Sequence, residues 1–288
     1  MSIAYQPHQS AYQLVALAQR IPSRARWLHA QQEILFAQIN QTLPLRGPRS
    51  RKVDAALALA ARFGVAWILA LSASFFFTFY LYFKQYRFGV SHSSEKPIFV
   101  GIGALKDPEL CALLCTLKGD DFFYLDETNM ELFFRTCRVR FSDLLAGWIS
   151  LRDDLGVALA QDAGVDGKYV LANAIANGFK YVYFRAWFRQ FIRLRGPAAT
   201  IAFSAASHVA FAAVAEGAHT LYLPHGFQAR TLLYPDFDEV ICSNLYEADH
   251  FRERLPDTRT RVVAPPFEPI ETTRIAVIAG DYVERPDQ

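Results

Sequence analysis

Short apolar segments alternate with helical segments through the last third of the chain, and no other feature restricts the fold as strongly. Helices are predicted at 208–218 and 244–255. The predicted strands are 200–203, 220–223, 239–242, 261–264 and 274–280. Strands that alternate with helices pair in parallel, and the helices between them form right-handed crossovers. The sequence therefore predicts an α/β fold with an open, parallel, Rossmann-like sheet.

The central part of the chain adds to this sheet. An apolar strand at 97–103 runs into a glycine-containing loop, and a short strand follows at 122–125. Helical patterns cover 144–163 and 168–195. We therefore expect one α/β domain over 97–272. The remaining residues, 273–288, are expected to begin a second domain or to form a C-terminal tail.

The first part of the chain, 1–96, is predicted to be helical and membrane-associating. Its residues 65–83 include no charged side chain, and aromatic residues crowd the second half of that segment. About 20 apolar residues suffice for a helix to cross a bilayer. A buried core helix is the alternative. The sequence does not decide whether the segment spans the membrane, dips into it or lies flat, because basic residues flank both of its ends.

Charge and cysteine content argue against a nucleic-acid-binding protein and against a metal-binding protein. The formal net charge of +2 gives no electrostatic case for a nucleic-acid partner. The four cysteines include Cys111 and Cys115, but no CxxC or HxxxH pair accompanies them. Metal sites require such additional ligands, so we expect no metal and read the cysteines as buried thiols.

Ligands of open parallel sheets bind outside the carboxyl ends of the strands. The predicted strands place three loops there: 101–106, 204–208 and 224–230. In the first loop, Gly103 is a candidate for contacting a phosphate, although two glycines without a third are equally consistent with a tight turn.

The second loop joins a strand to a helix and contains Ser204, Ser207 and His208. Hydroxyl groups and the amides of a helix N-terminus can hold an anion or a sugar hydroxyl. The alternative is that Ser207 only caps the helix.

The third loop contains the sharpest motif, Pro224-His225-Gly226. A histidine held at the mouth of a site can take a proton from an attacking hydroxyl, so His225 is the candidate catalytic base. Gly226 allows close approach of the backbone to a phosphate or a sugar. Gln228 and Arg230 are candidates for binding an anionic group. A purely structural role for His225 is the alternative.

Arg185, Arg189 and Arg193 recur every four residues on the predicted helix at 168–195. This spacing places them in one basic stripe. Such a stripe is either a solvated helix face or a surface that docks on anionic headgroups or on a lipid-linked diphosphate.

Residues 199–280 resemble the N-terminal, acceptor-side domain of GT-B glycosyltransferases. The resemblance is to bacterial capsule and lipopolysaccharide enzymes and to teichoic-acid-type glycerophosphotransferases. The matching segments are TIAFSAASHVAFAAVAEGAHTLYLPHGF, DFDEVICSN, RVVAPP and RIAVIAG. In some of these families the histidine of the His-Gly pair is the catalytic base, and the resemblance transfers that role to His225.

The resemblance implies transfer of a sugar or phosphosugar from a nucleotide-sugar, which is a substrate, with no cofactor. The partners would be a glycan or lipid-linked acceptor, the membrane surface, and a partner chain that supplies the donor domain if this chain lacks it. The expected location is the inner membrane, with the catalytic half facing the cytoplasm. The alternative function is a non-catalytic scaffold or acceptor-binding subunit of a polysaccharide assembly complex. A hydrolase using Ser204 or Ser207 is disfavoured because the sequence has no G-x-S-x-G elbow.

Overall fold

The computed structural model describes residues 15–29, 65–90, 98–101, 123–160, 167–196, 199–224 and 232–263. The predicted domain boundaries near 97 and 272 and the predicted strand at 274–280 lie outside these residues.

The described residues contain one sheet of six parallel strands in the order β2-β1-β3-β4-β5-β6. The strands are β1 (Ile98–Gly101), β2 (Phe123–Asp126), β3 (Thr200–Phe203), β4 (His219–Tyr222), β5 (Glu239–Cys242) and β6 (Arg259–Val262). The predicted α/β fold with an open, parallel, Rossmann-like sheet is therefore confirmed. The last described strand begins two residues earlier than predicted and is mostly exposed, as an edge strand can be.

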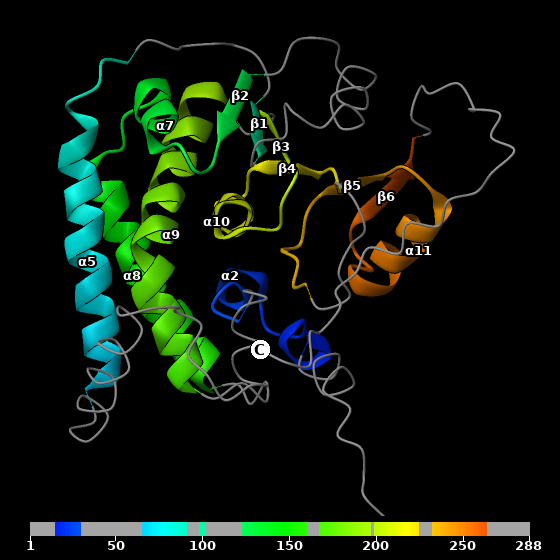
Figure 1. Cartoon of the computed structure of the whole chain (residues 1–288), viewed down its shortest axis with the longest axis horizontal. Helices are drawn as coiled ribbons and strands as arrows, with labels where there is room; N and C mark the ends of the chain where they lie inside the picture. The colour runs from blue at the N-terminus through cyan, green and yellow to red at the C-terminus, as the bar shows by residue number, and fades with distance from the viewer. Residues whose placement is uncertain are drawn as a thin grey trace, which may run out of the picture.

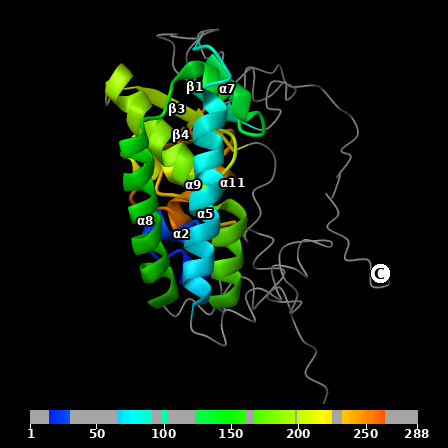
Figure 2. The same ribbon diagram turned by 90° about the vertical axis from the view of Figure 1, so that its left-hand side faces the viewer.

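The described helices pack in successive layers on one face of the sheet (Figure 1). They are α2 (Ser23–Arg26), α5 (Ala66–Gln85), α7 (Met130–Thr136), α8 (Phe141–Ala160), α9 (Gly167–Arg195), α10 (His208–Ala215) and α11 (Leu245–Arg254). In the views of Figures 1 and 2, α5 and α8 lie on the outer side of α9, away from the sheet. On its other side α9 packs against α10, which in turn packs against α2.

The core lies between the sheet and α9, and aromatic side chains dominate it. Trp187 on α9 is fully buried and stacks on Phe191, with ring centroids 5.2 Å apart. Its indole nitrogen donates a hydrogen bond to the carbonyl oxygen of Phe133. The side chains of the strands alternate, so one face of the sheet joins this core. The opposite face carries a smaller cluster that includes Phe99, Leu221 and Ile241.

Helix starts follow the capping residues in the sequence. Ser207 caps α10 by accepting a hydrogen bond from the amide of Val209. Asn244 caps α11 in the same way, and Glu247 reaches back to the amide of Ser243. This reciprocal arrangement resembles a capping box. The cap fixes where the helix after β5 begins, and thus the position of the loop at the carboxyl end of that strand.

The apolar segment predicted at 65–83 forms helix α5. Within the described part of the chain, α5 is the one helix long and apolar enough to cross a membrane, judged by length and composition only. It is 28% buried over its most apolar window. The predicted association with a membrane thus remains a prediction.

Candidate functional site

The strand order creates a switch point between β1 and β3. From β1 the chain proceeds to β2 on one side of the sheet, and it later returns to add β3 on the other side of β1. At such a point the connections from two neighbouring strands run in opposite directions, which opens a crevice outside the carboxyl ends of these strands. Ligands of open α/β sheets bind in this crevice. Among the described residues, those that follow β2 and β3 therefore line the candidate site.

Two side chains from different strand ends meet at this edge. Glu127 follows β2 directly, and its amide donates a hydrogen bond to the carbonyl oxygen of Gly101 at the end of β1. The hydroxyl of Ser207 donates a hydrogen bond of 2.5 Å to the Glu127 carboxylate. The same hydroxyl oxygen accepts from the Val209 amide at 3.2 Å. One serine thus caps α10 and also fixes the carboxyl group at the switch point.

Burial raises the pKa of the Glu127 carboxyl group above its ordinary value. The hydrogen bond from Ser207 and the positive charge of Lys180 oppose this increase, while Asp126 adds to it. Lys180 comes from the middle of α9, so a third element contributes charge to the edge. The Ser207 proton is already donated to Glu127, so the pair offers a ligand the carboxylate oxygen that Ser207 does not contact, which can accept a hydrogen bond from a sugar hydroxyl.

The other predicted residues of this loop have different environments. Ser204 is only 1% exposed, and its amide donates to the carbonyl oxygen of Val100. The ring of His208 lies 6.0 Å from that of Phe184. Burial, and secondarily the charge of Lys180, lowers the pKa of His208 to about 3. This imidazole is therefore neutral at pH 7 and is too weak a base to take up a proton there.

The remaining predicted site residues lie outside the described residues. They are Gly103, His225, Gly226, Gln228 and Arg230. The described chain reaches Pro224, two residues beyond the end of β4. The role of His225 as catalytic base thus remains a prediction.

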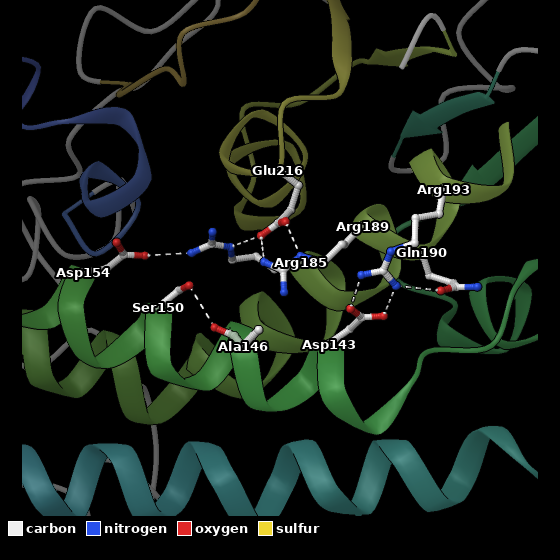
Figure 3. Close-up of polar contacts among 9 residues, drawn as sticks. All are labelled: Asp143, Ala146, Ser150, Asp154, Arg185, Arg189, Gln190, Arg193 and Glu216. Carbon is white, nitrogen blue, oxygen red and sulfur yellow. Dashed lines mark hydrogen bonds and ion pairs between the residues drawn. The ribbon is translucent and has the colours of Figure 1, made fainter. Parts of the chain in front are cut away.

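The arginine stripe differs from the expected exposed surface. The guanidinium groups of Arg185 and Arg189 both bind the carboxylate of Glu216, at 2.6 and 2.7 Å (Figure 3). Arg193 binds Asp143 at 2.6 Å. Arg185 also lies 3.3 Å from Asp154, and its side chain is only 8% exposed. Because their partners lie on α8 and at the end of α10, these arginines join helices within the protein. The Arg193 side chain remains 43% exposed, and docking of the stripe on anionic groups stays a prediction.

Glu127 and Lys180 are site residues that the sequence reasoning missed. Glu127 could have been found, because the strand-end rule that selected Ser207 applies equally to the strand predicted at 122–125. Lys180 offers no such signal, since only the packing of α9 brings it near this edge. Within the described residues no group of three or more His, Cys, Asp or Glu side chains could hold a metal ion.

A cavity of about 560 Å³ lies elsewhere, between residues 16–19 and α11. Its charged lining includes Asp249, Glu253 and Arg254. Helix α11 starts at the carboxyl end of β5 and returns toward the amino ends of the strands. The cavity runs along α11 from Tyr246 to Arg254, and none of its lining residues belongs to the strand ends at the switch point, so we do not assign the chemistry to it.

Replacing Ser207 with alanine is expected to lower the free energy of unfolding by about 1–2 kcal/mol, because α10 loses its cap and Glu127 loses a hydrogen-bond donor. Urea unfolding measures this change. The matched control is Ser150→Ala, since the Ser150 hydroxyl only donates to the Ala146 carbonyl oxygen within α8. That variant should stay within about 0.5 kcal/mol of the parent. Equal effects of the two substitutions would contradict the dual role of Ser207.

Comparison with protein-family models, curated proteins and solved structures found no match to this chain.

Proposed function

We propose that this chain is the acceptor-side domain of a glycosyltransferase that uses a nucleotide-activated sugar or phosphosugar in bacterial surface-polysaccharide or glycolipid synthesis. The observation that carries the proposal is the Glu127–Ser207 pair at the switch point of an open parallel sheet. This edge is where such sheets bind ligands. The resemblance of 199–280 to GT-B enzymes supports the same assignment.

The chemistry requires an acceptor hydroxyl that loses its proton as it attacks the sugar carbon or phosphorus. The bond from that atom to the phosphate oxygen of the nucleotide breaks, and the nucleotide leaves with the electron pair. In the proposal His225 takes that proton, since it follows β4 in the chain by three residues. Glu127 binds the acceptor, because the carboxylate oxygen that Ser207 does not contact can accept a hydrogen bond from a sugar hydroxyl, and Ser207 holds the carboxylate in place. The proposed partners are a glycan or lipid-linked acceptor, a nucleotide-sugar and a chain or domain that binds it. The proposed location is the cytoplasmic face of the inner membrane.

Ligand-induced stabilisation of the purified chain tests the proposal. The ligands would be UDP-, GDP-, CDP- and CMP-sugars and short-chain lipid-linked sugars. A ligand that binds only the folded state stabilises it by about 2.7 kcal/mol at 100 times its Kd. We expect a rise in melting temperature with an acceptor, with a smaller rise in Glu127→Gln. The matched control is Glu131→Gln, an exposed carboxylate that pairs with Arg135 on α7.

Two results would count against this function. If no acceptor or nucleotide-sugar shifts the melting temperature, the chain does not bind these ligands alone. If Glu131→Gln weakens the shift as much as Glu127→Gln does, the ligand is not bound at the switch point. Transfer activity of His225→Ala, measured with the donor that binds, then tests the proposed base separately.

One observation favours a second candidate, a non-catalytic membrane-associated subunit of a polysaccharide assembly complex. Helix α5 exposes large apolar side chains, including Phe76 at 72%. A membrane-bound scaffold needs such a surface but needs no base. Cells that carry His225→Ala distinguish the two candidates. Loss of the surface glycan indicates the transferase, and an unchanged glycan indicates the subunit.

A further inference from the structure

Helices α5 and α8 together form an exposed apolar surface. They run antiparallel, because Gln85 contacts Val139 at one end and Leu71 contacts Trp148 at the other. Figure 2 shows the two helices side by side on one side of the molecule. The outward side chains, 38–72% exposed, are Phe76, Phe77, Tyr80, Phe83, Phe141, Leu145 and Ile149. We call these residues the aromatic face.

The inner side of α5 is fixed to the protein by polar contacts. The Ser74 hydroxyl donates to the Ala174 carbonyl oxygen at 3.0 Å. The Thr78 hydroxyl lies 3.2 Å from the carbonyl oxygen of Phe179. The fit is close, since a Cβ added at Gly178 would lie 2.5 Å from the Ser74 hydroxyl oxygen. The helix therefore cannot rotate to bury its aromatic face against α9 without breaking these contacts.

The neighbours of α5 argue against a spanning orientation. Helices α8 and α9 flank α5 along its length, and the charged Lys180 of α9 follows Phe179, whose carbonyl oxygen contacts Thr78 in the middle of α5. A spanning α5 would bring these helices into the hydrocarbon, where charged side chains are costly. A helix that lies in the interface exposes only its apolar side to lipid. The packing thus favours α5 lying parallel to the membrane plane.

Charge at one end of the aromatic face indicates which surface it contacts. Helix α5 has no acidic residue. The basic side chains near its C-terminal end are Lys84, Arg87, Arg138 and Arg140. Two of them lie over tyrosine rings, Lys84 over Tyr80 and Arg138 over Tyr86. Aromatic residues rimmed by cations suit an interface with anionic headgroups. A second copy of this surface would present the same positive charge.

We propose that the aromatic face binds the surface of an anionic bilayer as a non-spanning anchor, with α5 parallel to the membrane plane. The proposal deepens the membrane-surface part of the proposed function and rests on that part alone. Vesicle binding requires neither donor nor acceptor, so it can fail while the sugar-binding experiment succeeds, and the reverse.

Flotation of the full-length protein with vesicles tests the proposal. We expect binding to vesicles that contain phosphatidylglycerol and weaker binding to pure phosphatidylcholine. The triple variant Phe76→Ser/Tyr80→Ser/Phe83→Ser should bind at least about tenfold more weakly, because it removes most of the apolar area that inserts. The matched control is Leu245→Ser/Tyr246→Ser, which alters side chains of α11 that are 68% and 69% exposed. Circular dichroism verifies that both variants fold.

Three results would overturn the proposal. The first is equal vesicle binding by the triple variant and the parent. The second is retention of the bound protein in the membrane after extraction with alkaline carbonate, which would indicate a spanning helix. The third is a dimer, detected by light scattering, that the triple variant abolishes while the parent binds no vesicles. That last result would assign the aromatic face to a second copy of the chain.

Discussion

Replacing Arg185 with leucine is expected to lower the free energy of unfolding by about 3–5 kcal/mol, as found when one partner of a buried ion pair is removed. Arg185 donates to Glu216 at 2.6 Å and lies 3.3 Å from Asp154. The side chains of the two acids are only 6% and 2% exposed. Without the guanidinium group, Glu216 retains Arg189, while Asp154 retains the Tyr181 hydroxyl and the distant Arg24. Urea unfolding at pH 7 measures the loss.

The same substitution on the surface serves as the control. Arg152 pairs with Asp153, and both side chains are more than half exposed. Exposed pairs contribute about 0–1 kcal/mol, so Arg152→Leu should change stability by no more than that. If Arg185→Leu costs as little as Arg152→Leu, water or neighbouring groups replace the lost partner, and the network does not hold α8, α9 and α10 together.

The arginines show why sequence alone could not locate this network. Their four-residue spacing correctly placed Arg185, Arg189 and Arg193 on one side of a helix. The spacing cannot indicate whether that side faces solvent or protein. The partners lie far away in the sequence, 31 residues for Asp154 and 50 for Asp143. No local pattern connects them, because tertiary packing alone brings α8 and α10 to α9.

The sheet, by contrast, was predictable because its signals are local. Strands β1 to β5 are short, largely apolar runs, whereas β6 (RTRV) is not, and Ser207 and Asn244 mark where two of the crossover helices begin. The parallel arrangement follows from the alternation of strands and helices. The alternation of strands and helices does not indicate the order of the strands in the sheet. The switch point between β1 and β3, and the contact of Glu127 with Ser207, became visible only in the structure.

Helix α5 was predictable in part. Its apolar character was evident, and its length matched prediction closely. Its polar residues Ser74, Thr78 and Gln85 recur at helical spacing and mark the side that packs on the protein. Such small polar residues do not interrupt an apolar run, so hydropathy alone hides the division into a packed side and an exposed side.

The second large effect concerns pH, and Asp154 is its source. Burial raises the pKa of the Asp154 carboxyl group to about 7, even though Arg185, Arg24 and the Tyr181 hydroxyl oppose the increase. An unfolded aspartate has a pKa of about 3.9. Between these two values the folded protein binds more protons than the unfolded protein. Stability therefore decreases as pH rises through this window, by up to about 4 kcal/mol.

Asp154→Asn removes the titrating group and preserves an oxygen that can accept from Arg185. We expect the free energy of unfolding of the parent, relative to this variant, to fall between pH 4.5 and pH 7.5. The buried histidines act in the opposite direction, because burial lowers the pKa of His29 to about 4 and that of His208 to about 3. Their contribution increases with pH up to about 6.5, but it is common to both proteins and cancels in the difference.

Urea unfolding of the parent and Asp154→Asn at closely spaced pH values separates two descriptions of the network. If the curves diverge as expected, desolvation outweighs the attraction of Arg185, and the carboxyl group is partly protonated at neutral pH. The variant Asp153→Asn, at an exposed neighbouring position, should then follow the parent. If the parent and Asp154→Asn run parallel, Arg185 keeps Asp154 ionised throughout. The ion pair would then be intact at every pH tested, and the loss caused by Arg185→Leu should not depend on pH.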